Sequence, residues 1–132
     1  MAIEYRINEP LRAQDVSDVF RSSGIKRPVD DLERIQSMID HADVTVTAWD
    51  EEQLVGIARA ITDFSYCCYL SDLAVRMDYQ KSGIGKELVQ RLREHLGDQV
   101  ALLLLSAPGA MEYYPRIGFD QIQNAFLIPR VK

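Results

Sequence analysis

The sequence predicts a single α/β domain built around a mixed β-sheet. The chain has 132 residues, which is enough for one hydrophobic core and falls within the usual size of one domain. Apolar residues recur at helical spacing in some segments and form short β-branched or continuous runs in others. Residues 66–105 follow the order strand, helix, strand, which favours a parallel pair with a right-handed crossover. We therefore expect one domain over residues 1–132.

The N-terminal third predicts one strand followed by two helices. Residues 3–7 can form a short strand, and a helix is expected over residues 11–23, ending before Gly24. A second helix is expected after Pro28, where acidic residues suit a first helical turn. The apolar residues at helical spacing in these two segments are Val16, Val19, Phe20, Leu32, Ile35, Met38 and Ile39.

The middle of the chain predicts a β-hairpin and then a strand, a helix and another strand. Residues 44–49 and 54–61 suit the two arms of a hairpin around a polar turn. Residues 66–75 are typical of a mostly buried strand, and residues 84–96 carry apolar side chains at helical spacing. The continuous apolar run at residues 100–105 suits a strand covered on both faces.

The C-terminal part predicts a short helix over about residues 108–114 and two closing strand segments, around residues 119–121 and 126–128. A homodimer formed through sheet edges or through these last strands is our expectation for a possible assembly.

Charge and composition exclude several classes of protein. Lysine and arginine number 15 against 20 aspartate and glutamate, a net charge of −5 at pH 7, so we expect no nucleic-acid partner. The apolar run at 100–105 is far shorter than the roughly 20 residues that span a bilayer, and residues 1–4 lack signal-peptide features. We therefore expect no membrane association and a cytoplasmic location. The adjacent Cys67 and Cys68 suit neither a structural disulfide nor zinc, so no metal is expected.

A glycine-containing turn precedes the third expected helix, at residues 80–86. Glycine lets main-chain N–H groups approach a ligand, and a helix N-terminus adds unpaired donors and partial positive charge, a combination that binds phosphate. Residues 76–93 carry about five basic residues against two acidic ones in an otherwise acidic chain. The glycine spacing matches neither a P-loop nor a dinucleotide fingerprint, so ATP, GTP and NAD are not expected. Taken alone, the glycines could simply shape a tight connection.

Two segments resemble motifs of the GNAT superfamily of N-acetyltransferases. Gln80-Lys81-Ser82-Gly83-Ile84-Gly85, preceded by Asp72-Leu73-Ala74-Val75, resembles its acetyl-CoA signature: Gln or Arg, two residues of any kind, Gly, any residue, then Gly or Ala. Tyr113-Tyr114-Pro115-Arg116-Ile117-Gly118-Phe119 resembles its late motif. The likeness covers nearly the whole chain. It implies a mixed, mainly antiparallel sheet of six or seven strands with about four helices, in which the fourth and fifth strands are parallel and splayed.

The resemblance also implies roles for individual residues. Acetyl-CoA would be the co-substrate, its pantetheine arm bonded by the main chain of Leu73, Ala74 and Val75 where the fourth strand bulges away from the fifth. The Leu73 N–H would stabilise the oxyanion, and the Tyr114 phenol would give a proton to the departing thiolate. The residues that would cradle the pyrophosphate are Gln80, Lys81, Ser82, Gly83, Ile84, Gly85 and Lys86.

The sequence departs from the family pattern at two positions. Ala107 stands where many members carry Asn, which removes one polar contact unless Ser106 replaces it. Tyr69 stands where histone-type members carry a catalytic Glu, so no general base can be carried over. Asp72 is then the candidate base, with a water chain or an already neutral amine as alternatives.

The resulting hypothesis is an N-acetyltransferase that moves the acetyl group of acetyl-CoA to a primary amine by direct attack in a ternary complex. The alternative is a non-catalytic acyl-CoA-binding regulatory module, and a plain interaction domain is a third possibility. The acceptor stays open among polyamine, antibiotic, amino acid, peptide N-terminus and protein lysine. Arg59 and Asp63 are candidates for lining its cleft, whereas His41 and His95 fit surface positions at helix C-termini.

Overall fold

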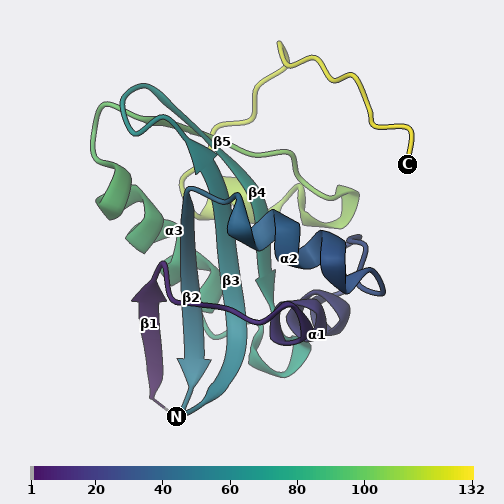
Figure 1. The fold of residues 1–132 in the computed structure, drawn as a ribbon. Helices are drawn as coiled ribbons and strands as arrows, with labels where there is room; N and C mark the ends of the chain where they lie inside the picture. The colour runs from purple at the N-terminus through teal and green to yellow at the C-terminus, as the bar shows by residue number, and fades with distance from the viewer. Residues whose placement is uncertain (1) are drawn as a thin grey trace.

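A five-stranded mixed sheet, in the order β1-β2-β3-β4-β5, forms the centre of the computed structural model, which describes residues 2–132 (Figure 1). The first four strands are antiparallel, and β5 pairs parallel to β4, as the sequence predicts. The strands are β1 Ile3–Ile7, β2 Val44–Asp50, β3 Gln53–Thr62, β4 Cys67–Val75 and β5 Ala101–Leu103.

Helices cover both faces of the sheet. The helices α1, Ala13–Ser23, and α2, Leu32–Asp40, lie on the near face in Figure 1, and α3, Ile84–Leu96, lies on the far face. The expected short helix is instead a 3₁₀ turn, Pro108–Ala110, followed by α4, Tyr113–Arg116. Another 3₁₀ turn, Met77–Tyr79, joins β4 to the segment that leads into α3.

Each face of the sheet has its own apolar cluster, and β3 contributes to both. Val55 and Ala58 pack with α3, whereas Leu54 and Ile57 pack with α1 and α2. At Gly56, a Cβ atom would lie 3.2 Å from Leu88 and 3.3 Å from Ile84, so glycine allows α3 to approach the sheet closely. This packing fixes the N-terminal end of α3 against the central strand.

The strands β4 and β5 part after a short pairing. The three residues of β5 pair only with Cys67–Tyr69, so β5 leaves the β4 edge free from Leu70 to Val75. On the other side of β4, Asp72 lies opposite Arg59 and Leu70 opposite Ala60, which makes Ser71 an extra residue in a β-bulge. The expected splay is therefore present, and the bulge lies at Ser71, just before the expected segment.

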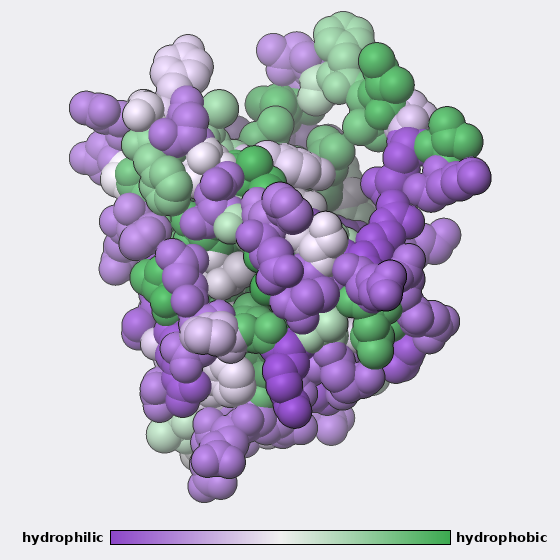
Figure 2. Space-filling model, viewed as in Figure 1, coloured by the Kyte–Doolittle hydropathy of each residue, from purple (hydrophilic) through white to green (hydrophobic). Residues whose placement is uncertain are grey.

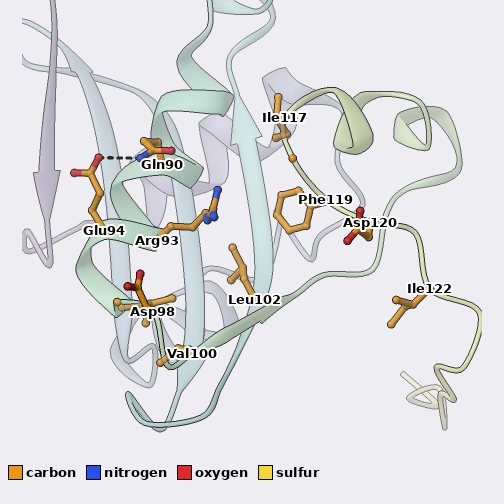
Figure 3. A pocket seen from close by; sticks show the side chains of 13 residues that line it. Gln90, Arg93, Glu94, Asp98, Val100, Leu102, Ile117, Phe119, Asp120 and Ile122 are labelled. Atoms are coloured by element: carbon orange, nitrogen blue, oxygen red, sulfur yellow. Dashed lines mark hydrogen bonds between the residues drawn. The ribbon is translucent and has the colours of Figure 1, made fainter.

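The expectation of six or seven strands was wrong, because the C-terminal segment forms none. Residues 119–121 and 126–128 carry side chains that suit strands, but a strand needs the donors and acceptors of a partner, and β5 offers an edge of only three residues. Figure 3 shows Asp120 and Ile122 lying apart from Leu102 of β5. The chain end extends away from the body of the molecule in Figure 1.

This C-terminal segment carries exposed apolar side chains. Phe126 is 99% and Ile128 96% exposed, and the segment accounts for a hydrophobic area at the upper right of Figure 2. Within residues 2–132, no helix combines the length and the apolar character that crossing a membrane requires.

The homodimer expected from the sequence stays a prediction, and the exposed segment makes it testable. We expect a particle of about twice the 15.0 kDa chain mass, because a second copy can cover the apolar segment and the free β5 edge. Phe126→Asp should shift it towards the monomer. Light scattering after size exclusion measures both, and a wild-type mass of 15.0 kDa at every concentration would contradict the expectation.

Candidate functional site

The turn before α3 has the geometry of an anion-binding site. Lys81 and Gly83 both have positive φ angles, 67° and 84°, on either side of Ser82. Successive N–H groups in such a turn point into one concavity, and the first turn of α3 adds N–H groups that lack intrahelical acceptors. A Cβ atom at Gly83 would meet nothing within 4 Å, so glycine is needed there for its backbone conformation.

Side chains next to the turn hold it to the rest of the fold. The Ser82 hydroxyl donates to the Tyr79 carbonyl at 2.5 Å, and the Tyr79 hydroxyl donates to Asp50 at 2.6 Å. The Gln80 amide donates to the carbonyl of Val75 at 2.9 Å, which ties the turn to the end of β4. Gln80 thus fixes the shape of the turn through its side chain.

Tyr113 covers the first turn of α3. A Cβ atom at Gly85 would lie 2.5 Å from the Tyr113 hydroxyl, so the second glycine provides room for this phenol. In the sequence, Tyr113 stands out only as part of the late motif. The signal that could have revealed this contact was the second glycine of the motif, which has a negative φ and needs another explanation.

Two cavities meet beside the free edge of β4. One, of about 480 Å³, is lined by the start of α3 and by Tyr113; the other, of about 630 Å³, is lined by residues 23–27 and by residues 104–110. The residues that line both are Leu73, Val75, Gln80, Ala110 and Tyr114. Leu73 and Val75, which pack with the α3 cluster, line both cavities, whereas Ala74, which packs with the α1 and α2 cluster, lines only the larger one. The smaller cavity therefore lies on the α3 side of β4, and the larger one extends past the free edge to the face that carries α1 and α2.

Tyr114 stands at the junction of these cavities. Its ring meets those of Tyr113 and Phe119 edge-on, with centroids 5.3 and 5.6 Å apart. Burial, helped by Tyr113, raises the pKa of the Tyr114 phenol above its ordinary value of 10, against the opposing charge of Arg27. The phenol therefore keeps its proton at neutral pH and can act as a proton donor.

Asp72 is fully buried on the face of β4 that carries α1 and α2. One carboxylate oxygen accepts from Arg27 Nε at 2.5 Å, and the other accepts from Arg59 Nε in a short ion pair. A base with both oxygens in ion pairs would have to give up those contacts to take a proton. The geometry thus favours a structural role, and proton acceptance by Asp72 stays a prediction without geometric support.

Of the other candidate residues, only Arg59 lies near the site. Asp63 accepts hydrogen bonds from the main chain of residues 65–67, which lowers its pKa and closes the turn between β3 and β4. His41 bonds the Ser37 carbonyl at the end of α2, a surface position. Ser106 and Ala107 both line the larger cavity, and the Ser106 hydroxyl donates to the Ala107 carbonyl.

A further hollow, of about 580 Å³, lies between α3, β5 and the segment that follows α4 (Figure 3). It is lined by the C-terminal half of α3, by Leu102 of β5 and by residues 117–120. The glycine turn and Tyr114 do not line it, so this hollow is separate from the site formed by the two joined cavities.

Comparison with known proteins identifies the family to which this arrangement belongs. A family model described as an acetyltransferase (GNAT) domain matches residues 13–127. The chain belongs to the GNAT acetyltransferase family. The match includes all of the residues that line the two joined cavities. It confirms the resemblance seen in the two sequence motifs and establishes this protein as an acetyltransferase.

Similar GNAT proteins occur in several organisms. The chain is 27% identical over 133 residues to an uncharacterized N-acetyltransferase, ycf52, of Gracilaria tenuistipitata var. liui, covering 92% of this chain and 71% of that protein. It is 30% identical over 122 residues to the GCN5-related N-acetyltransferase 1, chloroplastic, of Arabidopsis thaliana, covering 86% of this chain and 59% of that protein.

Solved structures share the fold. A probable acetyltransferase from meticillin-resistant Staphylococcus aureus superposes with a TM-score of 0.84 at 19% identity, covering 99% of both chains. The aminoglycoside N-acetyltransferase AAC(6')-Iy in complex with CoA gives a TM-score of 0.72 at 15% identity, covering 99% of this chain and 96% of that one.

The structural role of Asp72 leads to a stability prediction. Asp72→Asn should lower the free energy of unfolding by about 3–5 kcal/mol, because it leaves two guanidinium groups without their shared buried carboxylate. Glu87→Gln, which removes an exposed ion pair with Arg91, is the control and should cost about 0–1 kcal/mol. Urea unfolding of both variants measures the difference; equal costs would show that the buried cluster contributes no more than a surface pair.

Proposed function

We propose that this GNAT acetyltransferase moves the acetyl group of acetyl-CoA directly to a primary amine while both substrates are bound. The observation that carries this proposal is the pair of joined cavities that meet at Tyr114, the smaller on the α3 side of β4 and the larger extending to the face that carries α1 and α2. Two substrates that each occupy one of these cavities can be bound together. A ternary complex then needs no covalent intermediate on the protein.

The cysteines support a mechanism without an acyl-enzyme intermediate. Cys68 is buried among the residues that pack against α3, and burial raises the pKa of its thiol. A buried, protonated thiol is a poor nucleophile. Neither Cys67 nor Cys68 lines the two joined cavities.

The smaller cavity fits the donor. Its glycine turn and first helical turn suit a pyrophosphate, and Lys81 and Lys86 among its lining residues supply positive charge. The β4 edge at Leu73 and Val75, which β5 does not pair, lines this cavity, and its main-chain groups other than the Val75 carbonyl bonded by Gln80 can bond an extended arm as another strand would. Acetyl-CoA, when bound, supplies the acetyl group as a reactive thioester.

The residues at the junction then have distinct tasks. Tyr114 holds a proton close to the position that the departing sulfur would occupy, and its raised pKa keeps that proton in place. The Leu73 N–H is the proposed donor to the acetyl carbonyl. A neutral acceptor amine, deprotonated through water, needs no carboxylate base.

Acetyl transfer can be tested directly by measuring thiol release from acetyl-CoA with a panel of primary amines, together with calorimetric titration of CoA. We expect CoA binding and amine-dependent thiol release. Binding without amine-dependent turnover would instead support the non-catalytic module, and no binding at millimolar CoA would contradict the donor site.

Tyr114→Phe tests the proton donor. We expect kcat to fall by roughly 10²-fold with little change in CoA affinity, because the ring and its packing remain while the proton is lost. Tyr66→Phe, which alters a phenol that is 78% exposed outside the site, should leave kcat unchanged. An unchanged rate in Tyr114→Phe would remove this residue from the mechanism.

The pKa of the Tyr114 phenol also predicts how the rate depends on pH above neutrality. Because burial raises the pKa of Tyr114 above 10, the proton donor stays competent as pH rises to that value and is lost only above it. The rate at saturating substrates should therefore not fall between neutral pH and pH 10. A fall that begins well below pH 10 in the wild type but not in Tyr114→Phe would contradict the upward shift.

Gly83→Ala tests the donor cradle, with Gly24→Ala as its control. Both glycines are left-handed, with φ 84° and ψ of 6° and 3°, and a Cβ atom would meet nothing within 4 Å at either, so both variants should lose similar stability, about 1 kcal/mol. Only Gly83 lies in the smaller cavity, so only Gly83→Ala should also weaken CoA binding. Calorimetric titration measures this, and equal CoA affinities for the two variants would argue against the cradle.

A further inference from the structure

The larger cavity is positively charged on the side that faces away from the glycine turn. Lys26 and Arg27, from the loop between α1 and α2, are the two charged residues in its lining, and none of the described residues that line it is acidic. A cavity that receives a polycationic amine would be expected to carry carboxylates. Lys26 and Arg27 instead make this wall of the cavity positively charged.

Arg27 is held rigidly in that wall. Its Nε donates to Asp72 at 2.5 Å, one terminal nitrogen donates to the Ser71 carbonyl at 2.7 Å, and the other donates to the Lys26 carbonyl at 2.6 Å. Each terminal nitrogen of a guanidinium carries a second N–H. The side chain is 23% exposed, so this fixed group remains accessible from the cavity.

The buried cluster beneath the cavity leaves a positive charge uncompensated. Asp72 is one carboxylate shared by two guanidinium groups, those of Arg27 and Arg59. The Arg59 side chain is only 10% exposed and also donates to the Ser71 hydroxyl at 3.0 Å. The remaining charge is therefore presented to the cavity through Arg27.

Arg27 lies at the acceptor end of the site. It contacts β4 at Ser71, about 13 Å along the strand from Val75, where the glycine turn begins. That separation places it away from the proposed pyrophosphate position. Arg27 and Tyr114 line the same cavity, so one molecule bound there can face both groups.

We propose that the acceptor is a small amino carboxylate, such as a free amino acid, whose carboxylate binds Arg27 while its amine lies at Tyr114. This inference rests on the proposed function and names its substrate class. The guanidinium fork suits a carboxylate, and Lys26 attracts the same anion at longer range. Polyamines and aminoglycosides, which carry several positive charges, are disfavoured by the same wall.

These groups account for every bond and proton that changes in the transfer step. The acceptor nitrogen forms a bond to the acetyl carbon as the bond between that carbon and the sulfur breaks. Tyr114 gives its proton to the sulfur, which leaves with the bonding electrons. The proton lost by the acceptor nitrogen returns to Tyr114 through water. Arg27 takes no part in the bond changes and acts as a specificity-determining residue.

The test compares matched acceptors on the wild-type protein. Thiol release is measured with amino acids, the corresponding amino acid amides, spermidine and an aminoglycoside. We expect kcat/KM for the carboxylate of each pair to exceed that for its amide by roughly tenfold or more, as a charge-assisted bidentate contact requires. The amide has the less basic amine, so this advantage would not arise from a larger neutral fraction. Amides or spermidine that react as well as the amino acids would overturn the proposal.

Variants of Arg27 test whether the preference for a carboxylate arises at this residue. Arg27→Gln should raise KM for the amino acid by roughly tenfold or more, leave KM for the amide nearly unchanged, and preserve CoA affinity. Arg27→Lys should restore part of the loss. The control, Arg21→Gln, removes a guanidinium that pairs with the exposed Asp30 outside the cavity, and it should change neither value. An equal KM increase for acid and amide in Arg27→Gln would assign Arg27 a purely structural role.

The outcomes separate this inference from the proposed function. Turnover that favours amides or polycations would retain acetyl transfer and reject the amino carboxylate acceptor. CoA binding with no turnover of any amine would reject both. Should Arg27→Gln fail to fold because Asp72 loses a partner, the matched pairs on the wild type still decide the question.

Discussion

The parting of β5 from β4 is the constraint on which the rest of the site depends. A parallel pair that continued along β4 would satisfy its main chain and close the gap between the two cavities. Here the pairing ends at Tyr69, and the bulge at Ser71 bends the strand where the edge becomes free. The free edge, the passage between the faces and the position of Tyr114 all follow from this short pairing.

Buried charge and close packing hold the open site in shape. Asp72 ties the loop before α2 to β4 through Arg27, and the same carboxylate reaches β3 through Arg59. Glycine at position 56 lets α3 approach β3, which fixes the height of the anion-binding turn relative to β4. An open edge of a sheet would otherwise tend to close or pair with another chain. In this molecule, ion pairs on one face and helix packing on the other keep it available.

Patterns within single segments of the sequence predicted the helices and turns, whose formation depends mainly on neighbouring residues. Helical spacing located α1, α2 and α3, the polar turn at residues 50–53 separated the hairpin strands, and the glycine motif marked the start of α3. The absence of C-terminal strands was not predictable in this way, because the apolar run at residues 126–128 shows what a strand could bury but not whether a partner edge exists.

The site was partly predictable for the same reason. Tyr114 and residues 80–86 belong to contiguous motifs, so the sequence could place them, and all of them except Ser82 line the two joined cavities. Arg27 and Asp72 lie 45 positions apart in the sequence and become partners only through the packing of the loop on β4. Side-chain pairs of that kind leave no signal in a single sequence, and they carry the charge that the acceptor would meet.

The central claim is that donor and acceptor occupy the two joined cavities at the same time. Initial rates measured while acetyl-CoA and the amine are both varied test it most directly. Simultaneous occupancy predicts double-reciprocal lines that intersect, because each substrate adds to a complex that already holds the other. Parallel lines, together with a stable acetylated protein in the absence of amine, would show that the acetyl group first moves to the protein and would contradict the claim.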